Sequence, residues 1–306
     1  MRKVLLTGAT GFIGRHCLPA LLKSGYEVHA TFARAPLDGF DGVRWHQSDL
    51  LAVEQVRSLV DEVRPTHLLH FAWVVTPGAF WSSPDNFRWV QASLELLQCF
   101  AANGGQRAVM AGTCAEYNWK YGYCVEGVTP LEPSTVYGTC KHALHAMQEA
   151  LAAQSGLSAA WGRIFFPYGP HEYASRLIPS VIHALLQHEE ARCSHGRQIR
   201  DFLYVGDVAE AFVALLGSEV EGAVNIASGA PVTLKEIIEW LAQRLDCADL
   251  VRLGALAAPP DEPPLLVADV RRLREEVGWQ PRSSLEQGLD QTLAWWKTHL
   301  SVESNL

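Results

Sequence analysis

The chain has 306 residues, and its 25 lysines and arginines against 33 aspartates and glutamates give a formal net charge of −8. Domains that bind nucleic acid usually carry a clustered positive surface, so this balance excludes nucleic acid as the default partner. Hydrophobic residues at 48% and charged residues at 19% are typical of a globular chain, and no apolar run reaches the roughly 18 residues that a membrane span needs.

Strands alternate with helices along the first half of the chain, and the strands are apolar almost throughout. This pattern is typical of a parallel sheet covered on both faces. We therefore predict an α/β fold with a Rossmann-type doubly wound parallel sheet. The expected elements are a strand at 3–7, a helix through Leu22, a strand at 26–32, a helix at 53–63, a strand at 67–72, a helix at 86–103, a strand at 108–112, a helix at 137–154 and a strand at 159–165.

The pattern changes after Pro167, where shorter pieces follow. We assign 1–166 to the domain with the parallel sheet, expect about 200–227 to return to it, and assign 167–306 mainly to a smaller C-terminal α/β lobe. The expected pieces are helices at 177–187, 207–216 and 234–245, an extended segment at 198–204, a strand at 223–226 and a Pro-rich loop at 257–264.

A glycine-rich turn, TGATGFIG at 7–14, joins the first strand to the first helix. Gly8 allows the tight turn, Gly11 lets backbone N–H groups approach a pyrophosphate, and Gly14 lets the helix pack closely on the strand. The position directly after a strand, at the start of a helix, favours a dinucleotide site over an ordinary turn.

The end of the second strand indicates which dinucleotide is bound. An acid there would bind the ribose hydroxyls of NAD, but this strand ends at Phe32 and is followed by Arg34. Since a guanidinium can pair with a 2′-phosphate, we expect NADP(H) to be preferred and NAD(H) to remain possible; a solvated loop arginine is the alternative. Asp49 either accepts a hydrogen bond from the adenine amino group or caps the next helix.

Tyr137 and Lys141 lie four residues apart on one expected helix, hence on one face. A free tyrosine has a pKa of about 10, and an ammonium one turn away, together with an oxidised nicotinamide, would lower that pKa so that the phenol can exchange protons with a substrate oxygen. Thr113 ends the preceding strand, where ligand sites of parallel sheets form. It can donate a hydrogen bond to the same oxygen.

Taken in order, these motifs resemble the extended short-chain dehydrogenases/reductases that act as nucleotide-sugar epimerases, dehydratases and reductases. The resemblance covers nearly the whole chain. Its elements are TGATGFIG at 7–14, HFA at 70–72, Thr113 four residues before Tyr117, YGTCK at 137–141, RIFFPYGP at 163–170, RDFLYVGDVAEAF at 200–212, NIASG at 225–229 and GWQPRSSLEQGL at 278–289.

The resemblance implies an NAD(P)-binding Rossmann domain, a substrate-binding C-terminal lobe, a Thr113-Tyr137-Lys141 catalytic set and a homodimer through the helices at 86–103 and 137–154. Lys141 would also hold the nicotinamide ribose, and Arg200 would pair with the substrate diphosphate. The other expected cofactor contacts are Thr10, Phe12, Ile13, Leu50, Phe71, Ala72, Trp73 and Phe165. The other expected substrate contacts are Thr76, Cys114, Phe166, Arg176 and Leu177, with Arg176 alternatively a surface charge at a helix end.

The chain departs from the family at several of these positions. Dehydratases have an Asp-Glu pair after the catalytic threonine, where this chain has Cys114 and Ala115, so we reject that reaction. Phe166 replaces an asparagine that touches the substrate diphosphate, and Trp89 replaces a polar residue behind the active site. Bulky residues around Trp81 would restrict rotation of a sugar, which an epimerase needs and a reductase does not.

Two further patterns indicate no additional chemistry. His142 and His145 share a helix face, but the sequence offers no evident third ligand, so we expect no metal. The seven cysteines are odd in number and none lies in a C-x-x-C pair, which favours free thiols and a cytoplasmic location.

Three functions remain open. The leading hypothesis is an NADP(H)-dependent reductase of a nucleotide-linked keto-deoxysugar, with the keto group at C4. The alternatives are a nucleotide-sugar 4-epimerase that keeps NAD bound, and a non-catalytic dinucleotide-binding sensor or scaffold.

Overall fold

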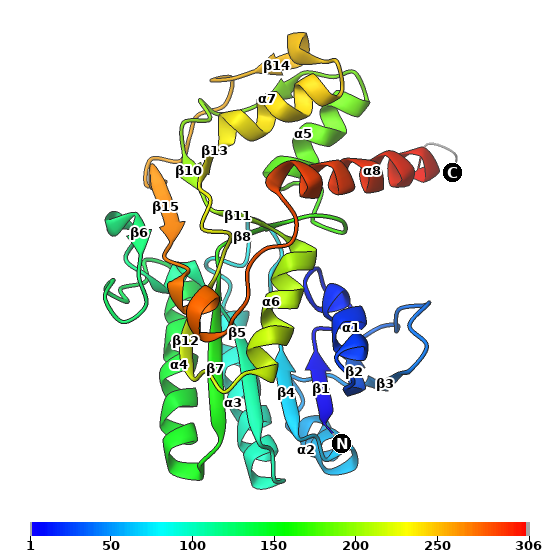
Figure 1. The fold of residues 1–306 in the computed structure, drawn as a ribbon, viewed down its shortest axis with the longest axis vertical. Coiled ribbons are helices and arrows are strands. Elements are labelled where there is room, and N and C mark those ends of the chain that lie inside the picture. Colours follow the sequence, from blue (N-terminus) through cyan, green and yellow to red (C-terminus); the bar gives the residue numbers. More distant parts are fainter. Residues whose placement is uncertain (1, 304–306) are drawn as a thin grey trace.

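A seven-stranded parallel sheet forms the centre of the molecule, which a computed structural model describes over residues 2–303. The strand order is β12-β7-β5-β4-β1-β2-β3, and every neighbouring pair is parallel (Figure 1). The predicted Rossmann-type sheet is thereby confirmed. The strands are β1 (Lys3–Thr7), β2 (Glu27–Phe32), β3 (Val43–Gln47), β4 (His67–His70), β5 (Arg107–Thr113), β7 (Ser158–Ile164) and β12 (Gly222–Ile226).

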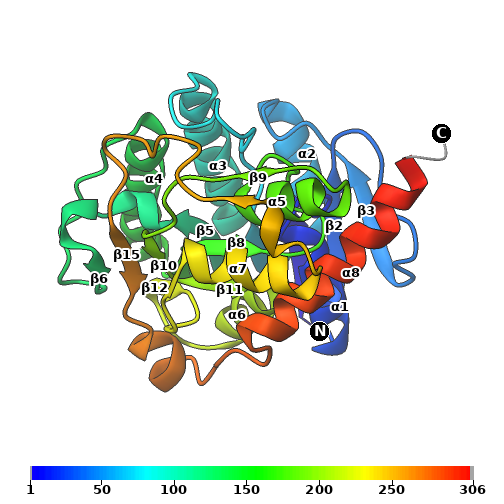
Figure 2. The same ribbon diagram turned by 90° about the horizontal axis from the view of Figure 1, so that it is seen from above.

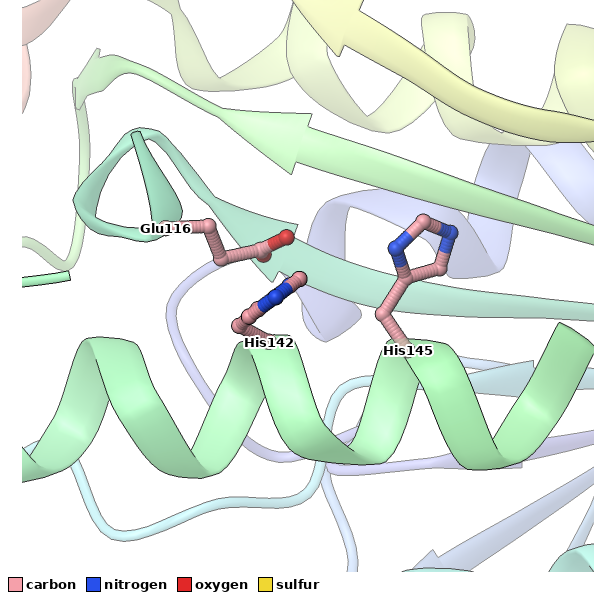
Figure 3. Close-up of side chains that lie close together, drawn as sticks. All are labelled: Glu116, His142 and His145. Atoms are coloured by element: carbon pink, nitrogen blue, oxygen red, sulfur yellow. The ribbon is translucent and has the colours of Figure 1, made fainter. Parts of the chain in front are cut away.

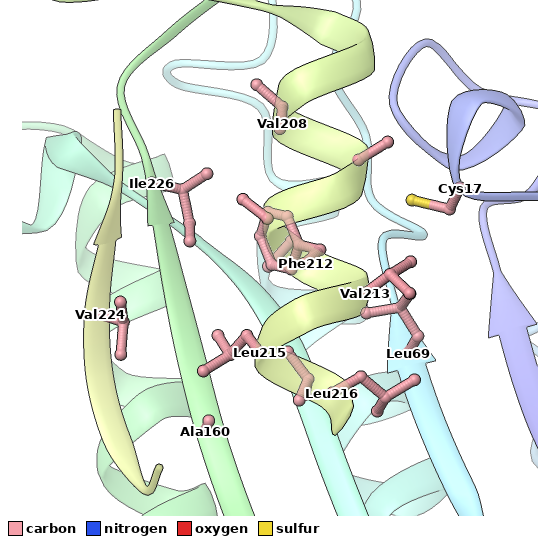
Figure 4. Packing of buried hydrophobic residues seen from close by; sticks show 14 of the residues in the cluster. Cys17, Leu69, Ala160, Val208, Phe212, Val213, Leu215, Leu216, Val224 and Ile226 are labelled. Atoms are coloured by element: carbon pink, nitrogen blue, oxygen red, sulfur yellow. The ribbon is translucent and has the colours of Figure 1, made fainter. Parts of the chain in front are cut away.

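Helices cover both faces of this sheet, as the apolar strands require. Seen from above, α2, α3 and α4 lie on one side and α1 and α6 on the other (Figure 2). On the second side, Phe212 and Leu215 of α6 point toward β7 and β12, while Leu216 points toward β4 (Figure 4). These helices are α1 (Gly14–Lys23), α2 (Val53–Val63), α3 (Asp85–Ala102), α4 (Val136–Ser155) and α6 (Val205–Gly217).

A second, smaller lobe stands over the carboxyl ends of the sheet strands (Figure 1). Its helices α5 (Leu177–Leu186), α7 (Leu234–Arg244) and α8 (Leu285–Glu303) share one apolar core that includes Ile182, Leu241 and Leu289. A four-stranded sheet of order β13-β10-β15-β6 and two strand pairs complete it. These short strands are β6 (Tyr123–Cys124), β8 (Phe166–Tyr168), β9 (Ala191–Arg192), β10 (Ile199–Arg200), β11 (Phe202–Tyr204), β13 (Val232–Thr233), β14 (Val251–Arg252) and β15 (Leu265–Ala268).

The chain crosses between the two parts more than once. After β7 it forms β8 and α5 in the smaller lobe, and it then returns through α6 to place β12 on the edge of the large sheet, beside β7. The expected segment at 198–204 is two strands, β10 and β11, which belong to different sheets. Within 2–303, no helix has the length and hydropathy that a membrane span would need.

Candidate active site

A cavity of about 1320 Å³ runs from the glycine-rich turn to the smaller lobe. All but two of the predicted site residues line it. The predicted cofactor contacts on its wall are Gly8, Thr10, Gly11, Phe12, Ile13, Gly14, Asp49, Leu50, Phe71, Ala72, Trp73, Tyr137, Lys141 and Phe165. The predicted substrate contacts on its wall are Thr113, Cys114, Phe166, Arg176, Leu177 and Arg200. Arg34 and Thr76 are not among the lining residues.

Two positions of the glycine-rich turn lie too close to other backbone atoms for any residue but glycine. Gly8 has a φ of +68°, and a Cβ there would lie 2.7 Å from the backbone nitrogen of Ala72. A Cβ on Gly14 would lie 2.2 Å from the Gly8 carbonyl oxygen. Ile13, at the N-cap of α1, makes no side-chain capping hydrogen bond. The N–H groups of Arg15 and His16 donate to the carbonyl oxygens of Gly11 and Ile13, so an anion such as a pyrophosphate would bind at the N–H groups of the turn that precedes them.

Of the two residues predicted to contact the adenosine part of the cofactor, Asp49 lines the cavity and Arg34 does not. Phe32 and Ala33 line the cavity, whereas Arg34 is exposed beyond its wall because it lies in the loop after β2. The Asp49 carboxylate accepts a hydrogen bond from the Leu51 N–H at 3.0 Å, so it stabilises the turn before α2 while remaining on the cavity wall.

Thr113 ends β5 and is the N-cap of a short 3-10 turn (Cys114–Glu116), which fixes its position. Its hydroxyl accepts a hydrogen bond from the Ala115 N–H at 3.2 Å, and its own N–H donates to Oε1 of Glu116 at 2.8 Å. This reciprocal pair is a capping box. The pattern Thr-x-x-Glu was visible in the sequence, and it could have indicated Glu116 as a residue of the site.

Tyr137 lies in the first turn of α4, beside this 3-10 turn. Burial raises the pKa of Tyr137, while a hydrogen bond with Thr113 and the charge of Arg176 lower it. Lys141 lies one turn further along α4 and is buried. The Lys141 Nζ donates to the Ala111 carbonyl oxygen at 2.8 Å and lies 3.8 Å from the centroid of the Trp73 ring.

A buried polar network supports the turn that carries Thr113. The Glu116 carboxylate accepts hydrogen bonds from Trp161 Nε1 and Arg163 Nε, both at 2.8 Å, and Arg163 also donates to the hydroxyl of Tyr117. Tyr117 in turn donates to Asn225 on β12 at 2.9 Å. The network therefore connects the 3-10 turn after Thr113 to β12 at the edge of the sheet, a link between distant segments that the sequence pattern did not reveal.

The two histidines of α4 have a third potential metal ligand beside them. The expectation that no third ligand is present is therefore corrected. Ligand atoms of Glu116, His142 and His145 lie within 4.8 Å of one another, and the three side chains converge between α4 and the 3-10 turn (Figure 3). The Glu116 carboxylate, however, already pairs with Arg163, whose Nη2 lies 3.3 Å from Nδ1 of His145. Nδ1 of His142 and Nε2 of His145 are buried and have no hydrogen-bond partner among the described residues. The guanidinium of Arg163 would repel a cation bound by these three side chains.

Aromatic side chains form the wall of the cavity around Tyr137. The ring of Phe80 packs edge-on against the Tyr137 ring, with centroids 4.9 Å apart, and Trp81 does the same at 5.8 Å. Trp119 packs against Trp81 at 6.0 Å and donates from Nε1 to the Cys114 carbonyl oxygen. Aromatic rings from two separate segments, 80–81 and 119, therefore line the cavity beside Tyr137.

The far end of the cavity carries charged groups. The buried Arg200 pairs with Glu262 at 3.0 Å, and its guanidinium lies 5.4 Å from the centroid of the Phe166 ring. Glu172 lies 3.9 Å from Arg176, its side chain is only 8% exposed, and its Oε2 has no hydrogen-bond partner among the described residues. Burial raises the pKa of Glu172 to about 8. Sequence reasoning missed both glutamates.

Comparison with known proteins identifies the family. A model of the NAD dependent epimerase/dehydratase family matches residues 4–227, which is well over half of the chain. The chain belongs to this family. It is an enzyme of the NAD(P)-dependent oxidoreductase type.

Relatives of this family member act on different nucleotide sugars. It is 25% identical to UDP-glucuronic acid decarboxylase 1 of Xenopus tropicalis over 99% of this chain and 74% of the relative. It is 26% identical to dTDP-6-deoxy-L-talose 4-dehydrogenase (NAD(+)) of Aggregatibacter actinomycetemcomitans over 77% of this chain and 88% of the relative. A solved structure of UDP-glucose 4-epimerase from Thermus thermophilus in complex with NAD superposes with a TM-score of 0.84, at 26% identity over 96% of this chain and 99% of that chain.

Proposed function

We propose that the enzyme is an NADP(H)-dependent reductase of a nucleotide-linked keto-deoxysugar, and that it reduces a 4-keto-6-deoxyhexose at C4. The observation that carries the proposal is the placement of Thr113, Tyr137 and Lys141 on the wall of one cavity with the glycine-rich turn. The 4-dehydrogenase relative supports the position, since oxidation of a C4 hydroxyl is the reverse of 4-ketone reduction.

The residues present fit a dinucleotide. Gly8 and Gly14 permit the tight turn, because a Cβ at either position would clash with backbone atoms. This turn places backbone N–H groups at the start of α1, where a pyrophosphate would bind. When bound, the reduced nicotinamide supplies hydride to the carbonyl carbon. Tyr137 donates its phenolic proton to the carbonyl oxygen, Thr113 donates a hydrogen bond to that oxygen, and Lys141 holds the nicotinamide ribose and neutralises negative charge on the phenol.

The aromatic wall favours reduction over epimerisation. An epimerase must let the intermediate ketone turn so that its other face meets the nicotinamide. Phe80 and Trp81 pack directly on Tyr137, so their rings take up space that this rotation would need. An apolar wall also suits a 6-deoxy sugar, because no hydroxyl at C6 then lacks a hydrogen-bond partner.

The expected preference for NADP(H) rests on the residues that follow β2, which include the cationic Arg34. No carboxylate directly follows Phe32, and the exposed Arg34 is free to move toward a 2′-phosphate. The solved relatives contain NAD, so the preference is tested by comparing NADPH with NADH.

The 4-epimerase remains the second candidate because a structural relative with this activity covers nearly the whole chain. It requires tightly bound NAD and no net consumption of NADPH. The sensor or scaffold hypothesis requires that no nucleotide sugar is turned over at all, although Thr113, Tyr137 and Lys141 are all present.

The decisive experiment measures oxidation of NADPH by absorbance with a panel of nucleotide-linked 4-keto-6-deoxyhexoses, beside NADH. We expect consumption with at least one substrate, faster with NADPH. The Tyr137→Phe variant should lose at least about 100-fold in kcat because it lacks the proton donor, while it still binds the dinucleotide in a fluorescence titration. Unchanged turnover in this variant would contradict the proposed role of Tyr137.

A further inference from the structure

The indole of Trp73 covers the amine of Lys141. Trp73 follows the end of β4 and is only 8% exposed, and Lys141 is 3% exposed. The Nζ atom lies 3.8 Å from the centroid of the Trp73 ring and 6.0 Å from that of Trp161, and it donates to the Ala111 carbonyl oxygen at 2.8 Å. One indole face and one carbonyl group thus form the immediate surroundings of the amine.

Trp73 is itself held in a fixed orientation. Its Nε1 donates to Oδ1 of the fully buried Asn86 at 2.8 Å, and Asn86 donates to the carbonyl oxygens of Phe80 and Ser83 at 2.7 and 2.9 Å. Trp89, one turn further along α3, packs on Trp73 with centroids 6.3 Å apart. The hydrogen bond to Asn86 on α3 fixes the plane of the Trp73 indole. The side chain is therefore held in one rotamer, with one face of the ring toward Lys141.

Few charged groups act on this amine. Glu116, in the turn after β5, favours the charged form of Lys141, whereas burial lowers the pKa of Lys141 to about 7. His70 on β4 is the other titratable group that interacts with Lys141. Burial and the charge of Lys141 lower the pKa of His70 to about 3, so its imidazole is neutral. Tyr137 is the titratable neighbour one turn away on α4. An aromatic face attracts a cation, and most strongly where water is excluded.

We propose that Trp73 is a positioning residue, whose indole face keeps Lys141 cationic and holds its amine next to the Tyr137 turn. The inference rests on the role proposed above for Lys141, and it adds a residue on which that role depends. Replacing the indole by an aliphatic side chain would leave the ammonium buried against an apolar surface. Lys141 would then lose its proton at a lower pH.

The test follows the titration of Lys141 directly, by NMR of protein labelled with 13C at the lysine ε carbon, with the signal assigned through Lys141→Arg. We expect Trp73→Leu to lower the titration midpoint by about one pH unit, a tenfold loss in proton affinity. Trp73→Phe keeps an aromatic face and should retain most of the effect. Trp45→Leu is the matched control, since it removes an indole on β3 that packs on Phe32 and lies away from Lys141, and its midpoint should equal that of the wild type.

Circular dichroism checks that each variant is folded, and Trp73→Met, whose longer and more flexible side chain adapts better to an irregular space, replaces the leucine variant if that one is not. A wild-type midpoint in the aliphatic variant, or equal midpoints in the phenylalanine and aliphatic variants, would overturn the inference. The titration needs neither substrate nor cofactor. A failed reductase assay with a shifted Lys141 therefore refutes the proposed function alone, and an unshifted Lys141 in an active reductase refutes only the role of Trp73.

Discussion

Glu172 is a carboxyl group whose environment suits its neutral form. It lines the cavity, one oxygen has no hydrogen-bond partner among the described residues, and Arg176 is 3.9 Å away, beyond hydrogen-bond distance. Its pKa of about 8 follows mainly from burial. A protonated carboxyl at neutral pH would donate a hydrogen bond to a ligand oxygen, a role that an ionised glutamate cannot take.

This raised pKa predicts how stability varies with pH. Because the folded state binds this proton more tightly than the unfolded state, the stabilisation is fully present below the unfolded pKa of about 4.5 and is lost as the pH rises through about 8. The loss amounts to at most about 4 kcal/mol by pH 8. In Glu172→Gln this component should vanish, so that the melting temperature falls less between pH 5 and pH 8.

Thermal denaturation across this pH range measures the effect. Glu189→Gln, at an exposed position, serves as the control and should follow the wild type. A Glu172→Gln variant with the same pH dependence as the wild type would mean that the carboxyl is already ionised at neutral pH.

The contact between helix α4 and the 3-10 turn sets the distance from Tyr137 to Thr113. Gly138 makes this contact possible, since a Cβ there would lie 2.3 Å from the Ala115 carbonyl oxygen. That obstacle is backbone and cannot rotate away. The helix must therefore move back from the turn if this glycine is replaced.

We expect Gly138→Ala to cost about 1–3 kcal/mol in free energy of unfolding and to reduce kcat by about 10- to 100-fold through misplacement of Tyr137. Chemical denaturation and the reductase assay measure the two effects. Gly217→Ala in α6 is the control, because the nearest atom to an added Cβ there, the Tyr26 hydroxyl oxygen, is 3.8 Å away, and it should change neither quantity. Wild-type activity in Gly138→Ala would show that the contact does not position the tyrosine.

The parts of the site that the sequence predicted are those set by local geometry. Helical periodicity alone puts Tyr137 and Lys141 on one face, and the glycine spacing alone indicates the turn before α1. The sequence did not reveal the pairing of Arg200 with Glu262 or the contact of Trp73 with Lys141, because each joins segments more than 60 residues apart. Four two-residue strands, β6, β9, β13 and β14, are too short to show a periodic pattern.

At the scale of the molecule, α3 and α4 present an outer face that carries exposed apolar side chains. Phe87 on α3 is 59% exposed and Met147 on α4 is 39% exposed, and the two helices pack against each other. Apolar side chains that gather on one exposed face are typical of protein–protein interfaces. We propose that a second copy of the chain covers this face in a homodimer, as the resemblance to the family implied.

Phe87→Glu should therefore convert a dimer into a monomer, because it would bury a charge in the interface. Sedimentation equilibrium measures the mass of each form. The matched control is Tyr121→Glu, which replaces an equally exposed aromatic residue, also 59% exposed, outside both helices. A wild-type protein that sediments as a monomer at micromolar concentration would contradict the proposal, as would a dimeric Phe87→Glu variant.

The late return of the chain to the large sheet determines when that sheet can be completed during synthesis. β12 pairs with β7, and α6 covers the adjacent face, yet both follow much of the smaller lobe in the sequence. While the ribosome translates that lobe, β7 has an unpaired edge and the apolar surface beneath α6 faces water. Such edges are templates for pairing with other chains. The nascent polypeptide thus passes through a stage at which chaperone binding would protect it from aggregation.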